Sequence, residues 1–180
     1  NGTHTECVGH ISKRAYTINQ CLQKFHFFAY LVSLTPKEKK NGDRLICRQQ
    51  LEEVLGKESP EALVVRTLPN HESKKRRNYS GSNPPYFHPE GIEFLVSKGI
   101  RHLLVDLPSI DREEDGGKLL GHRAFWNYPQ APRIDCTISE LIFVPDEIPD
   151  GPYLLNLQIA SFEIDVSPSK AVLFSLKKRN

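Results

Sequence analysis

Runs of apolar residues separated by short polar segments divide the chain into candidate strands and helices. Residues 24–34 are apolar at consecutive positions, which is typical of a strand covered on both faces. Residues 62–67 and 100–107 have the same character over shorter spans and predict two further buried strands. Three more strands are predicted in the last third of the chain, over residues 137–144, 153–164 and 171–176.

Between these strands, apolar residues recur at helical spacing. The repeat over residues 47–55 predicts a helix that Gly56 can end. Pro89 can open a second helix and Gly99 can close it, and a short third helix is predicted over residues 118–126. Because strands outnumber helices and are interleaved with them, the pattern predicts an α/β domain with a mixed sheet.

Composition narrows the class of protein. Of the 180 residues, 38% are hydrophobic and 26% are charged, which favours one globular domain over a disordered chain. No apolar run approaches the roughly 20 residues that span a membrane, so we expect no membrane partner. Lys and Arg total 24 against 22 Asp and Glu, and a net charge of +2 does not suggest nucleic acid as a partner.

The cysteines are far apart in the sequence and form no paired motif. We expect free, mostly buried thiols, because a chain of this length needs no disulfide framework. Such cysteine usage points to a cytoplasmic protein. The four stand at Cys7, Cys21, Cys47 and Cys136.

A basic run lies in the most polar part of the chain. Residues 69–85 are rich in Asn and Ser, and we predict a loop there. The loop carries four consecutive cations from Lys74 to Arg77. Such a run either binds phosphate or forms a solvated face of the loop. The first alternative would make the protein an interaction module whose binding depends steeply on salt concentration.

The first ten residues hold the densest group of side chains that carry chemistry. His4 and Glu6 are two positions apart, so in an extended segment both project from the same side. An imidazole nitrogen and a carboxylate oxygen suit a divalent ion such as zinc or manganese. His10, four residues beyond Glu6, is placed to carry a proton above such an ion. The alternative is a frayed polar terminus.

Two later residues are candidates for the same kind of site. Glu140 alternates with Ile138 and Ile142, and an ionised carboxylate buried in such a stripe needs a cation or an ion pair. His122 precedes Trp126 by four residues and so lies on the apolar face of its helix. The alternative for Glu140 is a salt bridge to an arginine or a position on an edge strand open to water. The alternative for His122 is a hydrogen-bonded position in the core.

Other polar residues are less specific. Asp106, Ser109 and Asp111 follow the predicted strand 100–107 and either line a site or cap a strand end and turn. The absence of a G-x-S-x-G motif argues against a serine hydrolase of the usual α/β type. There is also no H-E-x-x-H, Walker or G-x-G-x-x-G motif. The remaining histidines are expected to be structural or exposed: His26, His71, His88 and His102.

Several of these segments together resemble the cyclase family of metal-dependent hydrolases, which includes bacterial kynurenine formamidase and isatin hydrolase. The opening GTHTECVGH, from Gly2 to His10, is similar to the family hallmark H-x-G-T-H-x-D-x-P-x-H, whose first histidine would immediately precede Asn1. Asp106, Ser109 and Asp111 resemble its D-x-x-S-x-D arrangement. The resemblance continues through Gly121-His122-Arg123, Glu140 and the closing segments 153–157 and 168–174.

The resemblance implies a set of roles. His10 would be the acid/base residue of the reaction. One or two divalent ions, Zn²⁺ or Mn²⁺, would be bound by His4, Glu6, His122 and Glu140. Two positions depart from the hallmark. Glu6 replaces an Asp, and its longer side chain can change the metal spacing. Val8 replaces a proline, which we expect to loosen the turn that brings His10 over the metal.

The resemblance also implies a swivelling β/β/α domain with barrel-like packing, covering residues 1–180 without the family's leading segment. The implied activity is hydrolysis of an amide-like C–N bond in a small molecule, an aromatic amide (as in an arylformamidase) or a lactam, by a homodimer or larger homo-oligomer. The alternative is a non-catalytic member that binds a metal or a small molecule. Four aromatic residues either stack on such a substrate or pack in the core: Phe27, Tyr86, Phe87 and Trp126.

Overall fold

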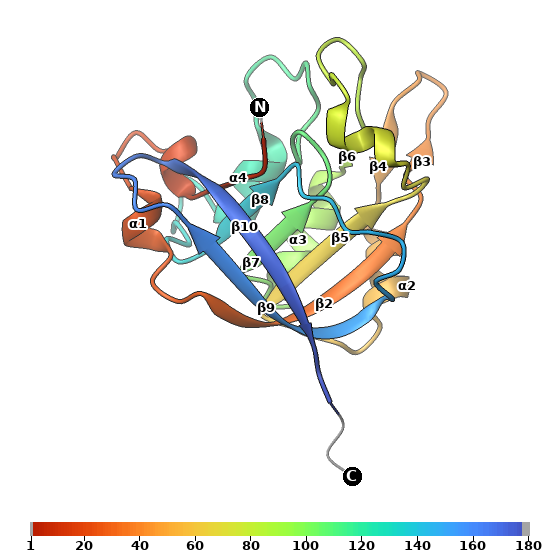
Figure 1. The fold of residues 1–180 in the computed structure, drawn as a ribbon. Coiled ribbons are helices and arrows are strands. Elements are labelled where there is room, and N and C mark those ends of the chain that lie inside the picture. Colours follow the sequence, from red (N-terminus) through yellow and green to blue (C-terminus); the bar gives the residue numbers. More distant parts are fainter. Residues whose placement is uncertain (1, 178–180) are drawn as a thin grey trace.

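A closed, mixed barrel of seven strands forms the centre of the molecule (Figure 1). The computed structural model describes residues 2–177. The barrel strands are β1 (His4–Glu6), β2 (His26–Leu34), β5 (Ala62–Thr67), β7 (His102–Val105), β8 (Thr137–Glu140), β9 (Gly151–Ile159) and β10 (Val166–Ser175). Around the ring they follow the order β1-β10-β9-β2-β5-β7-β8. The pairs β2-β5, β5-β7 and β7-β8 are parallel, and the others are antiparallel. The prediction of an α/β protein with a mixed sheet is confirmed.

Three helices cover one outer face of this barrel. They are α2 (Arg48–Leu55), α3 (Pro89–Ser97) and α4 (Leu120–Trp126), which lie behind the strands in the view of Figure 1. Leu51 of α2, Leu95 of α3 and Phe125 of α4 share one buried cluster with Leu63 and Val65 of β5. Packing against the sheet therefore buries the apolar face of each helix.

A second hydrophobic cluster fills the interior of the barrel. Val64 of β5, Leu104 of β7 and Leu155 of β9 belong to it. Because successive side chains of a strand point to opposite faces, β5 contributes to both clusters, and all six of its residues are buried. This accounts for the nearly continuous apolar run at residues 62–67.

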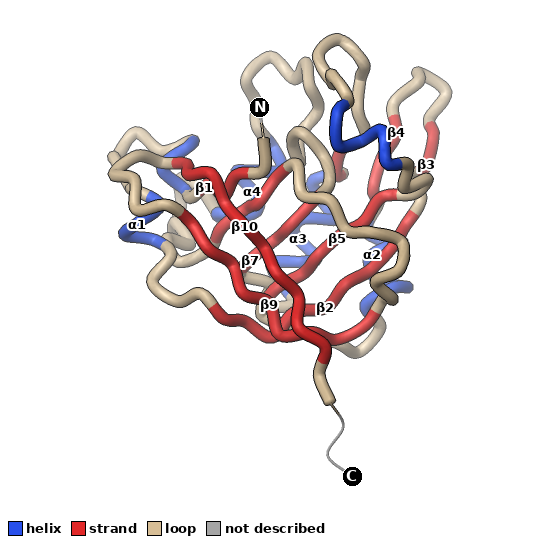
Figure 2. Tube along the Cα trace, in the orientation of Figure 1, coloured by secondary structure: helices blue, strands red, loops and turns tan. Residues whose placement is uncertain are grey.

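The remaining elements are short, as the tube drawing in Figure 2 shows. A side sheet consists of β3 (Lys37–Glu38), β4 (Arg44–Ile46) and β6 (Tyr86–Phe87). The others are the helix α1 (Ile18–Cys21) and the 3₁₀ helices η1 (Val8–His10) and η2 (Glu72–Arg76). The segment 69–85 is a loop as predicted, except that it contains η2.

Most predicted strands have different ends in the structure. β2 alternates buried and exposed residues over its first half, and Phe28 is 44% exposed, so the prediction that both faces are covered is wrong there. β8 ends at Glu140 rather than at residue 144, because Leu141 has a φ of 54°, which lies outside the β region. β7 is shorter than predicted at both ends, β9 ends at Ile159, and β10 begins at Val166.

All four cysteines are free thiols, as predicted. Three of them are buried, whereas Cys47 at the start of α2 is partly exposed. Within residues 2–177, no helix is long and apolar enough to span a membrane.

His102 is a buried histidine outside the candidate site. Its ring lies against Phe27, with centroids 3.9 Å apart, and its Nδ1 is 2.9 Å from the Thr137 hydroxyl. Burial lowers the pKa of His102 to about 3, and the charge of Arg101 acts in the same direction. Between about pH 6.5 and pH 3 the unfolded chain binds a proton here and the folded protein does not. The contribution of His102 to the free energy of unfolding therefore falls as the pH falls through this window.

We expect His102→Gln to lessen the acid sensitivity of folding. Relative to the variant, the wild-type free energy of unfolding should fall by up to about 1.4 kcal/mol for each pH unit below 6. Denaturant unfolding of both proteins at several pH values measures the two slopes. The control is His71→Gln, because His71 is exposed and its removal should leave the slope unchanged. Equal slopes for the wild type and His102→Gln would show that the lowered pKa of His102 does not contribute to the acid sensitivity of folding.

Candidate metal centre

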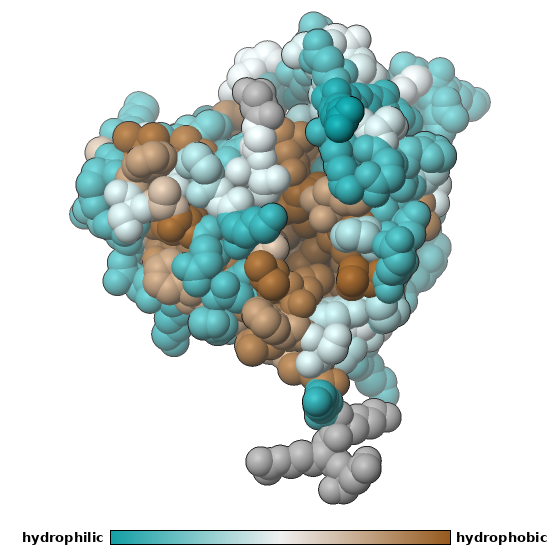
Figure 3. Space-filling model, in the orientation of Figure 1, coloured by the Kyte–Doolittle hydropathy of each residue, from teal (hydrophilic) through white to brown (hydrophobic). Residues whose placement is uncertain are grey.

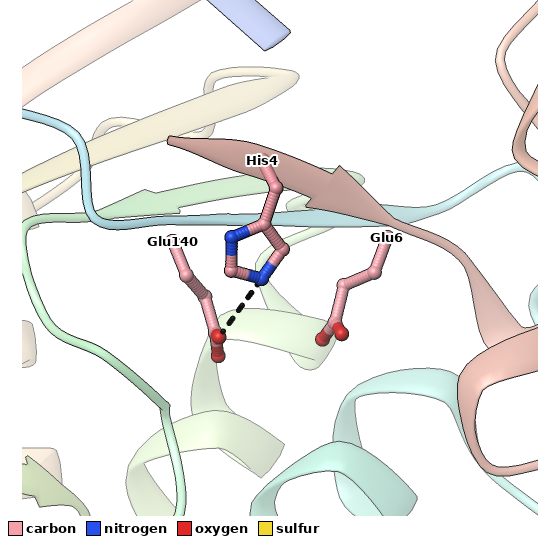
Figure 4. Close-up of side chains that lie close together, drawn as sticks. All are labelled: His4, Glu6 and Glu140. Atoms are coloured by element: carbon pink, nitrogen blue, oxygen red, sulfur yellow. Dashed lines mark ion pairs between the residues drawn. The ribbon is translucent and has the colours of Figure 1, made fainter. Parts of the chain in front are cut away.

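The pairing of β1 with β8 brings the N-terminal cluster to Glu140. His4 lies opposite Glu140 in this antiparallel register, and Glu6 lies opposite Ile138. The Nε2 atom of His4 is 3.5 Å from Oε2 of Glu140. Figure 4 shows the side chains of His4, Glu6 and Glu140 directed towards one another. One potential ligand atom from each residue lies within 4.8 Å of the other two.

The alternation of side chains along β1 determines which residues face the site. Thr5, between His4 and Glu6, points to the opposite side, where its hydroxyl lies 2.6 Å from that of Ser139. Both hydroxyls are buried. Thr3 also fixes the start of the strand, because its hydroxyl donates to the carbonyl of Leu141 at 2.6 Å. The strand is thus held with both ligand candidates on one side.

His122 approaches the same carboxylates from α4. Its Nε2 is 2.9 Å from Oε1 of Glu6 and 3.8 Å from Oε1 of Glu140. Its Nδ1 is 2.6 Å from Oδ2 of Asp111. A carboxylate on the second ring nitrogen is typical of metal-binding histidines, because it fixes the tautomer and the ring orientation. His122 is a hydrogen-bonded buried residue that also adjoins the candidate ligands.

Asp111 links His122 to the start of α4. Its carboxylate accepts hydrogen bonds from the backbone N–H groups of Gly121 at 2.6 Å and His122 at 3.1 Å. A Cβ atom on Gly121 would lie 2.9 Å from Oδ1 of Asp111, so this close approach needs a glycine. Asp111 therefore caps the helix and orients the imidazole at the same time.

Gly121→Ala is expected to weaken metal binding without unfolding the protein. The added methyl group must displace the Asp111 carboxylate, which loosens the ring of His122. Losing such an orienting contact typically lowers metal affinity roughly 10- to 100-fold. Competition with a chelating dye measures this affinity, and Asp111→Asn should change it in the same direction. Unchanged affinity in both variants would show that Asp111 does not position a metal ligand.

His10 stands at the open side of the cluster, on η1. Its Nε2 is 3.5 Å from Oε2 of Glu6, and its Nδ1 is 2.9 Å from Oδ2 of Asp165. The backbone N–H groups of Ile11 and Ser12 both donate to the carbonyl of Val8, which is itself buried. The turn is closed and Val8 is packed within it, and the expectation that Val8 loosens the turn compared with a proline stays a prediction.

Electrostatics favour a cation at this place. Glu6, Glu140 and Asp111 are all buried, and burial raises the pKa of Glu140 although the hydrogen bond to His4 opposes this. Burial opposes the charge of His122. Its hydrogen bonds to Asp111 and Glu6, and the charges of both glutamates, outweigh that effect and raise its pKa to about 10. The hydrogen bond to Glu140 raises the pKa of His4. Three buried carboxylates beside imidazoles thus attract positive charge, and the donors fit Zn²⁺ or Mn²⁺.

The other candidates from the sequence make contacts of a different kind. Asp106 accepts hydrogen bonds from Thr67 and Lys74. Ser109 serves the turn, since its hydroxyl accepts the N–H of Asp111 at 3.1 Å. Among the four aromatic candidates, three are buried core residues: Phe27, Phe87 and Trp126. The fourth, Tyr86, donates its hydroxyl to Asp43.

A cavity of about 800 Å³ opens beside the cluster. Its wall contains Thr3 and Leu141, which are chain neighbours of His4 and Glu140, and also Asp106, Ser109 and Asp111. Residues 74–80 of the basic loop, which includes η2, complete much of the wall. Figure 3 shows the molecule from the same side as Figure 1, with hydrophobic residues in the middle of this face and hydrophilic residues around them. A cavity of this size suits a small molecule.

Comparison with known proteins identifies the family. Residues 1–112 match the family model described as Putative cyclase, so the chain belongs to that family. No curated protein matches the chain. The role of each site residue as a ligand stays a prediction.

Several solved structures share the fold at low sequence identity. One, described as a potential metal-dependent hydrolase with cyclase activity, superposes with a TM-score of 0.74 at 17% identity over 99% of this chain and 80% of that one. A predicted metal-dependent hydrolase from Bacillus stearothermophilus gives 0.65 at 15% identity, over 96% and 76%. An isatin hydrolase bound to the product analogue thioisatinate gives 0.67 at 16% identity, over 98% and 72%.

Proposed function

We propose that this chain is a metal-dependent hydrolase that cleaves an amide-like C–N bond of a small molecule. The observation that carries the proposal is the convergence of His4, Glu6, Glu140 and His122 beside a cavity large enough for such a substrate. Family membership supports it, as does a fold shared with structures described as metal-dependent hydrolases, one of them an isatin hydrolase.

In the proposed reaction a bound cation and the residues of the chain have different roles. A divalent ion held by His4, Glu6, His122 and Glu140 would supply Lewis acidity, which polarises a carbonyl and lowers the pKa of water towards about 7. Burial of the carboxylates keeps competing water away from their oxygen atoms. Asp111 holds the ring of His122 in place through the Nδ1 contact at 2.6 Å.

His10 is the residue proposed to transfer protons. Its side chain is 43% exposed, so a substrate can reach it, and its Nε2 faces the carboxylate of Glu6. In this proposal Nε2 accepts a proton from the attacking water and afterwards donates it to the leaving nitrogen. Asp165 contacts Nδ1 and so keeps Nε2 directed at the cluster.

Chelation tests the proposal. Exhaustive removal of metal is expected to abolish hydrolysis of formanilide or lactam substrates, and added Zn²⁺ or Mn²⁺ should restore it. Metal content and circular dichroism are measured on the same samples, so that unfolding is not mistaken for loss of metal. Hydrolysis that survives complete removal of metal would refute the mechanism. Stoichiometric metal with no turnover on any formamide, lactam or lactone would instead indicate a non-catalytic binding protein.

A further inference from the structure

The basic run of the sequence lines the cavity beside the candidate metal centre. Its wall includes all four cations of the run, Lys74, Lys75, Arg76 and Arg77, and also Thr3 before β1. In Figure 1, η2 is the short yellow-green helix at the upper edge of the molecule. A run that could have been a solvated loop face instead contributes four residues to the wall of the cavity.

Two of the four cations are already neutralised. Lys74 Nζ lies 2.8 Å from Oδ2 of buried Asp106 and also donates to the hydroxyl and carbonyl of Thr67. These contacts anchor the loop to the ends of β5 and β7. Lys75 pairs with Glu72 at 2.7 Å, and its Nζ lies 4.3 Å from the centroid of the Phe143 ring.

Arg76 and Arg77 differ from these lysines. Among residues 2–177, neither guanidinium takes part in an ion pair or a side-chain hydrogen bond, and both residues are exposed. Arg77 has its Cζ 5.3 Å from the centroid of the Tyr79 ring, which also lines the cavity. Two fixed positive charges with unused donors therefore face the same space.

The acidic residues of the cavity cancel only part of this positive charge. Asp106 is paired with Lys74, and Asp111 with His122. Glu113 is the third acidic residue of the wall, and its two oxygens accept the backbone N–H groups of Gly81 and Asn83, at 2.6 and 3.1 Å. Backbone N–H groups leave the negative charge of Glu113 in place, but in the described chain the two unpaired guanidinium groups outnumber this single carboxylate.

We propose that Arg76 and Arg77 bind an oxyanion group of the substrate, a carboxylate or a phosphate, while its amide lies at the metal centre. Guanidinium groups match carboxylate and phosphate geometry with paired hydrogen bonds, which makes them selective for such groups. The ring of Phe143 and the neighbouring Ile142 give the cavity an apolar wall for the body of the molecule. This inference rests on the proposed function and adds the substrate class: a small amide that carries an anionic group.

The test compares substrates that differ only in charge. N-formylanthranilate and its methyl ester are offered to the metal-supplied wild type, to the double variant Arg76→Gln/Arg77→Gln and to the control Lys40→Gln. Lys40 is an exposed cation remote from η2 in the sequence, and it does not line the cavity. We expect the double variant to lose roughly 10- to 100-fold in kcat/KM for the carboxylate, mainly through KM, and to keep its rate on the ester. The control should match the wild type.

A binding measurement separates this inference from the proposed hydrolysis. Calorimetric titration with benzoate and with phenyl phosphate reports anion binding without turnover, and the relative affinities show which oxyanion the site prefers. The double variant should bind its preferred anion at least about 10-fold more weakly than the wild type.

Each outcome decides one of the two proposals. Arginine-dependent anion binding without hydrolysis of these compounds or of any other formamide, lactam or lactone would support the anion site and refute the hydrolase. Hydrolysis with no loss of carboxylate preference in the double variant would overturn the anion site and leave the hydrolase standing. Anion affinity that is equal in wild type and double variant would likewise overturn the anion site, whether or not turnover is seen.

Discussion

Glu140→Gln is expected to release the bound metal and abolish hydrolysis while the barrel stays folded. Glu140 faces His4 through one carboxylate oxygen and His122 through the other, so it connects the two sides of the cluster. The amide nearly matches the carboxylate in volume but carries no charge, and it is a much weaker metal ligand. Elemental analysis after dialysis and the rate of hydrolysis measure the two effects.

The stability of the metal-free protein gives this variant a second readout. Burial disfavours the ionised form of Glu140, so the neutral amide should leave the metal-free Tm unchanged or raise it. Added Zn²⁺ or Mn²⁺ should raise the Tm of the wild type by mass action and should not raise that of Glu140→Gln.

The matched control is Glu147→Gln, which makes the same change at an exposed position. It should keep full metal content and activity. Full metal occupancy in Glu140→Gln would show that Glu140 does not bind the metal.

His10→Gln is expected to lower kcat by roughly 10²- to 10⁴-fold and to leave metal content unchanged, because a positioned proton carrier commonly contributes that much to a rate. The glutamine side chain keeps a hydrogen-bonding group near Asp165 but cannot carry a proton between water and a leaving nitrogen. Steady-state kinetics on a formanilide and elemental analysis measure the two quantities. Added imidazole should restore part of the rate.

Asp165→Asn is the companion variant for His10. Asp165 contacts only the far nitrogen of the ring, so its loss should cost less than the loss of His10. A rate in His10→Gln within about threefold of the wild type would exclude His10 as the proton carrier, since transfer commonly contributes at least 10².

Local chemistry allowed the sequence to predict several element ends. Pro89 opens α3 and Gly56 follows the last residue of α2, because both residues act on the backbone beside them. The one-turn helix α1 was missed although Thr17 and Gln20 form a capping box, a signal visible in the sequence. Four residues are too few for an apolar periodicity to show.

Other boundaries depend on contacts that no local pattern contains. Ile142 and Val144 continue the alternation of β8, yet the strand ends at Glu140. Both residues are buried in the barrel cluster after the backbone has turned at Leu141. The burial of these two residues therefore gives the sequence a strand-like alternation beyond the end of β8.

The candidate site was predictable in parts. Period-two alternation indicated that His4 and Glu6 share a side, and the resemblance to a family joined them with His122 and Glu140. The pairing of β1 with β8 is a long-range contact that the sequence does not encode locally. The same holds for Asp111, whose function depends on where α4 begins, and for the basic loop, whose cavity exists only in the folded chain.

The three residues of β1 have both a structural and a functional role. The strand closes the barrel between β8 and β10, and it carries two of the proposed ligands. A slip of one position would turn Thr5 towards the candidate metal centre and both proposed ligands away from it. Insertions and deletions in this segment should therefore abolish ring closure and chemistry together. Among functional descendants of this sequence, the spacing of these positions should be fixed more strictly than the identity of their neighbours.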